Sequence, residues 1–178
     1  MQRRNFSLTL GSLAASTLAL NPSFVLAQSN APRVGVDYAQ LSKPVPTEAP
    51  AGKIEVIEFL WHNCPHCSAF EPSLAAWAKA LPKDVAFRRV PIAFREDFAP
   101  QQKLYYALEA MGLVDKMHAR VFAAIHDEKQ NLTTGESIIN WMVRQGLDKA
   151  KFTERFSSFS VNSKASRARQ IQGAYQIE

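Results

Sequence analysis

Residues 54–77 read IEVIEFLWHNCPHCSAFEPSLAAW. The apolar, β-branched run Ile54–Leu60 favours a buried strand. In Pro65–Leu81 the apolar side chains recur at helical spacing, so the sequence predicts a helix that begins at the cysteines and stops before Pro82. Val85–Val90 is again apolar and β-branched and predicts a further strand. A strand–helix–strand order predicts a parallel pair of strands with a right-handed crossover.

The segments on either side of this unit differ from each other. Residues 28–52 are rich in Pro, Ala and Ser, which excludes a long helix, and a short strand is expected at 36–41. After the second strand of the pair the chain is expected to be helical, with Thr134 and Ser160 as caps. The expected helices lie at about 98–111, 114–127, 135–145, 148–158 and 160–175. The fold class is therefore α/β with a block of helices.

Cys64 and Cys67 are the only cysteines in 178 residues. A zinc site would need about four ligands, and the histidines are poor candidates for the other half. His62 and His66 are too close along the chain to serve as the other half. His118 and His126 lie on a helical segment without ligand spacing, and a lone histidine there is more typical of a packed or solvated residue. Covalent haem is excluded because Ser68, and not His, follows the second cysteine.

A purely structural disulfide remains open, although a loop closed across two residues removes little entropy from the unfolded chain. A redox pair explains more of the pattern. Residues at i and i+3 share a helix face, so the two sulphurs can meet. Cys64 would lie at the amino end of the helix, where free N–H groups favour a thiolate. Pro65 suits the first turn, and His66 adds a positive charge or a donor beside the sulphur.

The amino terminus is typical of an exported protein. Arg3 and Arg4 precede a mostly apolar stretch at 6–20, and residues 25–27 supply small side chains for cleavage. A signal peptide is therefore expected at 1–27. A membrane anchor is the alternative, but the apolar portion is short for a spanning helix. The arginine pair fits either the general secretory route or the twin-arginine route.

The charge balance is mild. Without residues 1–27, which contain two arginines and no acid, the net charge falls from +5 to +3. Such a charge favours solubility and gives no indication of nucleic-acid binding.

The motif Cys64-Pro65-His66-Cys67, preceded by residues 56–59 and followed by Phe70-Glu71, resembles the DsbA family of periplasmic thiol:disulfide oxidoreductases. The resemblance covers about residues 34–178. It implies a thioredoxin-like domain at 28–178, interrupted by a helical insertion at about 98–175. It also implies a location in the periplasm, oxidation of reduced exported polypeptides, and reoxidation by a membrane quinone-linked oxidase of the DsbB kind. A monomer without cofactor or metal is expected.

The resemblance further implies the role of each site residue. Cys64 is the exposed nucleophile, Cys67 is its partner in the Cys64–Cys67 disulfide, and His66 tunes the thiolate. Glu58 lies six positions before Cys64 and matches the family's buried acid, which assists proton transfer; a strand acid that simply faces solvent is the alternative. Alternation along the strand places Glu55 and Glu58 on opposite faces.

The chain departs from the family in one respect. Members carry a cis-proline loop that faces the cysteines and leads into further strands and a last helix, whereas no proline follows Pro100 here. The expectation is therefore that the cis-proline loop, the last strands and the last helix are absent, either because the sequence is a fragment or because the gene is truncated. A disulfide reductase or isomerase, or a non-catalytic thioredoxin-like binding module, is the alternative function.

Overall fold

The computed structural model describes residues 31–178, and the chain divides into two units, 1–40 and 41–178. The predicted signal peptide lies outside the described residues. The strand expected at 36–41 is wrong. In its place the chain makes a turn, in which Val34 and Tyr38 form an isolated bridge and Gly35 has a φ of +78°. That φ lies in the left-handed region, which ends extended structure.

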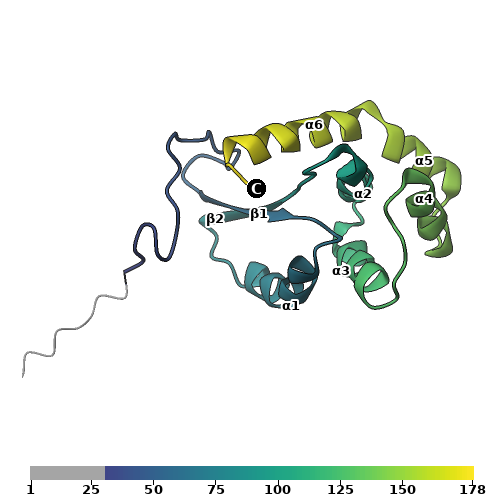
Figure 1. Cartoon of the computed structure of the whole chain (residues 1–178), viewed down its shortest axis with the longest axis horizontal. Coiled ribbons are helices and arrows are strands. Elements are labelled where there is room, and N and C mark those ends of the chain that lie inside the picture. Colours follow the sequence, from purple (N-terminus) through teal and green to yellow (C-terminus); the bar gives the residue numbers. More distant parts are fainter. Residues whose placement is uncertain (1–30) are drawn as a thin grey trace, which may run out of the picture. The chain divides into compact units, whose positions relative to one another are not determined.

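The sheet of the larger unit contains two parallel strands in the described part of the chain. β1 (Ile54–Leu60) pairs with β2 (Val85–Pro91) in a register that runs from Ile54 opposite Val85 to Leu60 opposite Pro91. Helix α1 (Pro65–Lys79) connects them, as the sequence predicts. Figure 1 shows α1 on one side of the strands and the last helix, α6, on the other.

A helical block follows β2, as predicted. Its elements are a 3-10 turn η1 (Glu96–Phe98), α2 (Ala99–Ala110), α3 (Val114–His126), α4 (Gly135–Arg144), α5 (Lys149–Ser157) and α6 (Phe159–Ala174). Thr134 caps α4 through a capping box with Ser137. The predicted cap Ser160 is wrong, because Ser158 has extended backbone and its Oγ accepts from the N–H of Val161, so the cap of α6 lies two residues earlier.

Helix α2 lies at the centre of the core. Leu104, Ala107 and Leu108 of this helix have no exposed surface, and α2 packs against α3, α4, α5 and α6. Leu60 and Val90 continue the same core into the sheet. The carboxyl ends of β1 and β2 are therefore held against the helical block. The loop that follows β1 begins at this junction.

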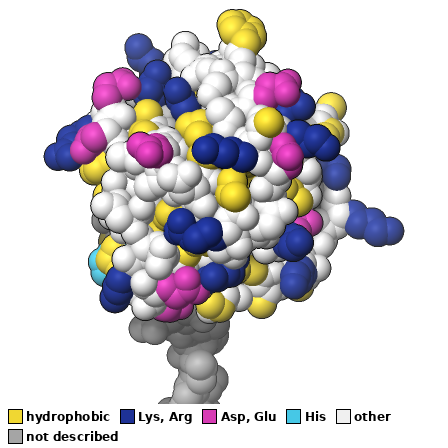
Figure 2. Space-filling model, turned by 90° about the vertical axis from the view of Figure 1, so that its right-hand side faces the viewer, with side chains coloured by type: hydrophobic (Ala, Val, Ile, Leu, Met, Phe, Trp, Pro, Cys, Tyr) yellow, Lys and Arg dark blue, Asp and Glu magenta, His cyan; other side chains and the backbone are white. Residues whose placement is uncertain are grey.

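The charge on the surface is mixed, in agreement with the mild net charge of the sequence. On the face shown in Figure 2, basic and acidic side chains are interspersed and do not gather into one basic patch. Among residues 31–178, no helix combines the length and the apolar character needed to cross a membrane.

Candidate functional site

Cys64 and Cys67 lie where β1 leads into α1. After β1 the chain makes a turn in which the N–H of Cys64 donates to the carbonyl of Trp61 over 2.9 Å. Cys64 is the N-cap residue of α1, with φ of −81° and ψ of 118°, and Pro65 occupies the first helical position, where no N–H is required. Both cysteines are half-buried free thiols, so the disulfide between them stays a prediction. His66 is exposed in the first turn of α1.

The Cys67 thiol holds its proton strongly. Burial, above all, raises the pKa of Cys67 to about 11, and the neighbouring Cys64 and the Glu58 carboxylate act in the same direction. A thiolate on Cys67 is therefore disfavoured by a poorly hydrated site and by a nearby negative charge.

Glu58 does not face solvent. Its side chain is 10% exposed, and Arg89 Nε donates to Glu58 Oε2 over 2.7 Å. The Nη2 of the same arginine donates to both carboxylate oxygens of Glu71, on α1, over 2.9 Å each. Burial raises the pKa of Glu58 despite the facing guanidinium. Burial acts in the same direction on Glu71, but the contacts with His118 and Arg89 outweigh it and lower the Glu71 pKa. One arginine thus joins two carboxylates of different proton affinity, one on β1 and one on α1.

Three histidines extend this cluster to the loop that carries Cys64. His118 of α3 places Nε2 3.3 Å from Glu71 Oε2, an ion-pair distance without the alignment of a hydrogen bond. Its Nδ1 lies 3.2 Å from Nε2 of His62, which is buried. Burial, and then His118, hold the pKa of His62 well below its usual value, so His62 is neutral. The Nε2–H of His126 donates to the His62 carbonyl over 2.8 Å. Helix α3 therefore holds the turn before the cysteines through two side chains.

The sequence indicated part of this arrangement. Glu58 was expected as a buried acid near the pair, and its side chain is buried there. Arg89, His118 and His126 were not expected to take part. The role of Arg89 could have been found from the parallel register, because that register places Arg89 directly opposite Glu58. No comparable signal exists for the histidines, because His118 lies 56 residues along the chain from His62. No group of three or more potential metal ligands is found among residues 31–178.

Comparison with known proteins agrees with this geometry. A model of the DSBA-like thioredoxin domain matches residues 85–178. The thiol:disulfide interchange protein DsbA of Burkholderia cepacia is 41% identical over 168 residues, which cover 93% of this chain and 79% of that protein. The DsbA of Bordetella parapertussis is 42% identical over 166 residues, with 93% and 78% covered.

Solved structures give the same result for the fold. The crystal structure of Pseudomonas aeruginosa DsbA superposes with a TM-score of 0.74 at 39% identity, over 79% of this chain and 72% of that one. Reduced DsbA1 of Neisseria meningitidis gives a TM-score of 0.72 at 28% identity, over 83% and 79%. The predicted fold class, a thioredoxin-like α/β fold with inserted helices, is confirmed.

Proposed function

Because this chain belongs to the DsbA family of thiol:disulfide interchange proteins, and is accordingly an oxidoreductase, we propose that Cys64 and Cys67 form the disulfide that it passes to reduced exported polypeptides. The observation that carries the proposal is the position of the pair. Cys64 occupies the N-cap of α1 and Cys67 lies in its first turn, just after the short turn that follows β1. Unpaired N–H groups at this end of the helix favour a thiolate on Cys64.

The reaction begins with the oxidised pair. A substrate thiolate attacks Sγ of Cys64, the Cys64–Cys67 bond breaks, and the electron pair of that bond leaves with Cys67. The second thiol of the substrate then loses its proton and attacks the substrate sulphur of the mixed disulfide, which releases Cys64. The substrate has lost two electrons and two protons, and the pair has gained the electrons.

Glu58 supplies the proton that Cys67 needs. The Cys67 thiolate is unstable where it forms, since burial raises its pKa to about 11. The Glu58 carboxyl is close enough to influence Cys67, and burial raises its own pKa, so it can carry a proton at a higher pH than an ordinary carboxyl. Arg89 holds the Glu58 side chain in place. His66, exposed beside the pair, stabilises the anionic sulphur of Cys64.

The setting of this activity forms part of the proposal. Residues 1–27 act as a signal peptide that directs the chain to the periplasm, residues 28–178 form the thioredoxin-like domain, and residues 98–175 form its helical insertion. A membrane quinone-linked oxidase of the DsbB kind reoxidises the pair. The protein acts as a monomer, and exchange between thiols and disulfides needs no cofactor on this chain.

Trapping of the mixed disulfide tests the assignment of the two cysteines. Without Cys67, the Cys67→Ala variant should accumulate a disulfide between Cys64 and a substrate peptide, which mass spectrometry of non-reduced digests locates. Cys64→Ala is the matched control and should accumulate none. Adducts that form on Cys67 in the control, and not on Cys64 in the first variant, would contradict the assignment.

A further inference from the structure

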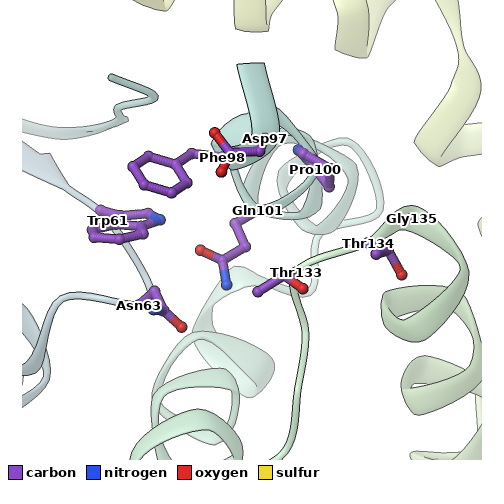
Figure 3. A pocket seen from close by; sticks show the side chains of 9 residues that line it. All are labelled: Trp61, Asn63, Asp97, Phe98, Pro100, Gln101, Thr133, Thr134 and Gly135. Carbon is purple, nitrogen blue, oxygen red and sulfur yellow. The ribbon is translucent and has the colours of Figure 1, made fainter. Parts of the chain in front are cut away.

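A pocket of about 470 Å³ opens beside the cysteine turn (Figure 3). Trp61 and Asn63 of that turn form one side, Phe98 and Gln101 of the η1–α2 segment form another, and Thr133 lies below. The Trp61 and Phe98 rings stack with centroids 4.2 Å apart. The pocket therefore has aromatic walls and is built from three segments that are distant in the sequence.

Two polar atoms in this pocket have no hydrogen-bond partner within residues 31–178. They are Nε1 of Trp61, a donor, and Oε1 of Gln101, an acceptor. Gln101 is only 2% exposed, and its Nε2 donates to the Leu132 carbonyl over 3.0 Å, which fixes the amide so that Oε1 faces the other way. In Figure 3 the indole nitrogen and this oxygen face the same space. A buried polar group without a partner costs free energy, so the pair is suited to a ligand that accepts from one and donates to the other.

The charge of the pocket excludes a strong preference for ions. Asp97 is the one carboxylate that lines it among the described residues, and Arg95 pairs with that carboxylate through Nε over 2.9 Å. A neutral group that carries one acceptor and one donor fits these surroundings best. A peptide bond carries both, in a fixed planar arrangement.

The position of the pocket indicates which peptide bond it would receive. Asn63 directly precedes Cys64, and consecutive Cα atoms are about 3.8 Å apart. A substrate cysteine joined to Cys64 therefore has its own flanking peptide bonds within reach of the pocket. Every cysteine of a polypeptide has such bonds, so recognition here would not depend on the substrate's sequence.

We propose that the pocket formed by Trp61, Asn63, Phe98 and Gln101 binds a backbone amide of the substrate next to its reacting cysteine. Its carbonyl accepts from Trp61 Nε1, and its N–H donates to Gln101 Oε1. The proposal rests on the proposed function, and it adds a substrate subsite on the side of Cys64 that faces the helical block.

The test uses a reduced two-cysteine peptide and two analogues, in which an ester replaces the amide just before or just after the reacting cysteine. The ester removes the N–H and keeps a carbonyl, which is a weaker acceptor, in the same place. Pre-oxidised protein is mixed with each peptide, and the second-order rate constant is measured. One ester should react about 5-fold more slowly than the parent, which corresponds to ~1 kcal/mol. Equal rates for all three peptides, as expected if only water occupies the pocket, would overturn the proposal.

Two variants locate the effect. Gln101→Met should bring the amide-to-ester ratio to about 1, because the acceptor is gone. Gln102→Met is the matched control. Gln102 is also buried, its Nε2 donates to the Pro91 carbonyl over 2.8 Å, and its Oε1 has no partner within the described residues. Because Gln102 does not line the pocket, the amide-to-ester ratio should stay as in the unaltered protein. An unchanged ratio in Gln101→Met would also overturn the proposal.

A further variant keeps the proposal testable if Gln101→Met does not fold. Trp61→Phe removes the donor and keeps a ring on Phe98, so it should oxidise the parent peptide about 5-fold more slowly, whereas Trp77→Phe, on the far part of α1, should not. Equal rates in the two variants would contradict the proposal. A protein that oxidises none of the peptides would instead contradict the proposed function.

Discussion

Replacement of Arg89 by leucine would test the central feature of the buried cluster. Arg89 is the cation shared by Glu58 and Glu71, whose side chains are 10% and 9% exposed. Arg89→Leu leaves two carboxylates close to each other without the guanidinium that they share. Removal of one partner from a buried ion pair costs about 3–5 kcal/mol, and the variant should lose this much free energy of unfolding at pH 7.

The loss should depend on pH. Without the guanidinium the pKa values of both carboxyls rise in the folded state, so the folded variant binds protons more tightly than its unfolded chain. Stability that comes from a raised carboxyl pKa is present below the unfolded value near 4.5 and is lost as pH rises through the folded value. The difference from the unaltered protein should therefore be smaller at pH 5 than at pH 7.

Urea denaturation of the reduced full chain at both pH values measures this effect. Arg95→Leu is the control, because Arg95 forms its ion pair with Asp97 in solvent and its loss should leave the midpoint unchanged. Adding Glu58→Gln to Arg89→Leu should restore part of the stability, since one of the uncompensated charges is gone. The reasoning would be refuted if Arg89→Leu alone were no less stable than Arg95→Leu. It would also be refuted if Arg89→Leu lost the same free energy of unfolding at pH 5 and at pH 7.

Three further measurements examine the site and the core. Glu58→Gln should slow oxidation of a dithiol peptide by up to about 100-fold, the lower range for a positioned acid; Glu55→Gln, on the opposite face of β1, is the control, and equal rates in the two would remove Glu58 from proton transfer. In a Cys64→Ala variant, the pH dependence of Cys67 alkylation should give a pKa below about 11 but above the ordinary value of 9.0, because burial remains when Cys64 is gone. A Cys67 pKa of 9.0 or lower would contradict burial as the main cause. Leu104→Ala, at the fully buried centre of α2, should lower the free energy of unfolding by about 2–5 kcal/mol, as calorimetry or urea denaturation would detect.

Local sequence was sufficient for most of the elements. The run at Ile54–Leu60, the helical spacing after Pro65 and the caps near the later helices depend on neighbours within a few residues, and the structure forms β1, α1 and the helical block as predicted. The errors are also local. The turn at Gly35 replaces an expected strand, and Ser158 rather than Ser160 starts α6, because two serines two residues apart offer the same capping chemistry and only the backbone geometry distinguishes them.

The sequence by itself determined the reactive part of this protein. Cys64 and Cys67 are held in one helical turn by their spacing, and Glu58 precedes them on a strand. Only the tertiary structure decided what surrounds them. His118 and His126 come from α3, far along the chain from His62, and Gln101 of α2 lines the same pocket as Trp61 although 40 residues separate them. Contacts of this kind depend on how helices pack against one another, and no periodicity along the chain records that packing.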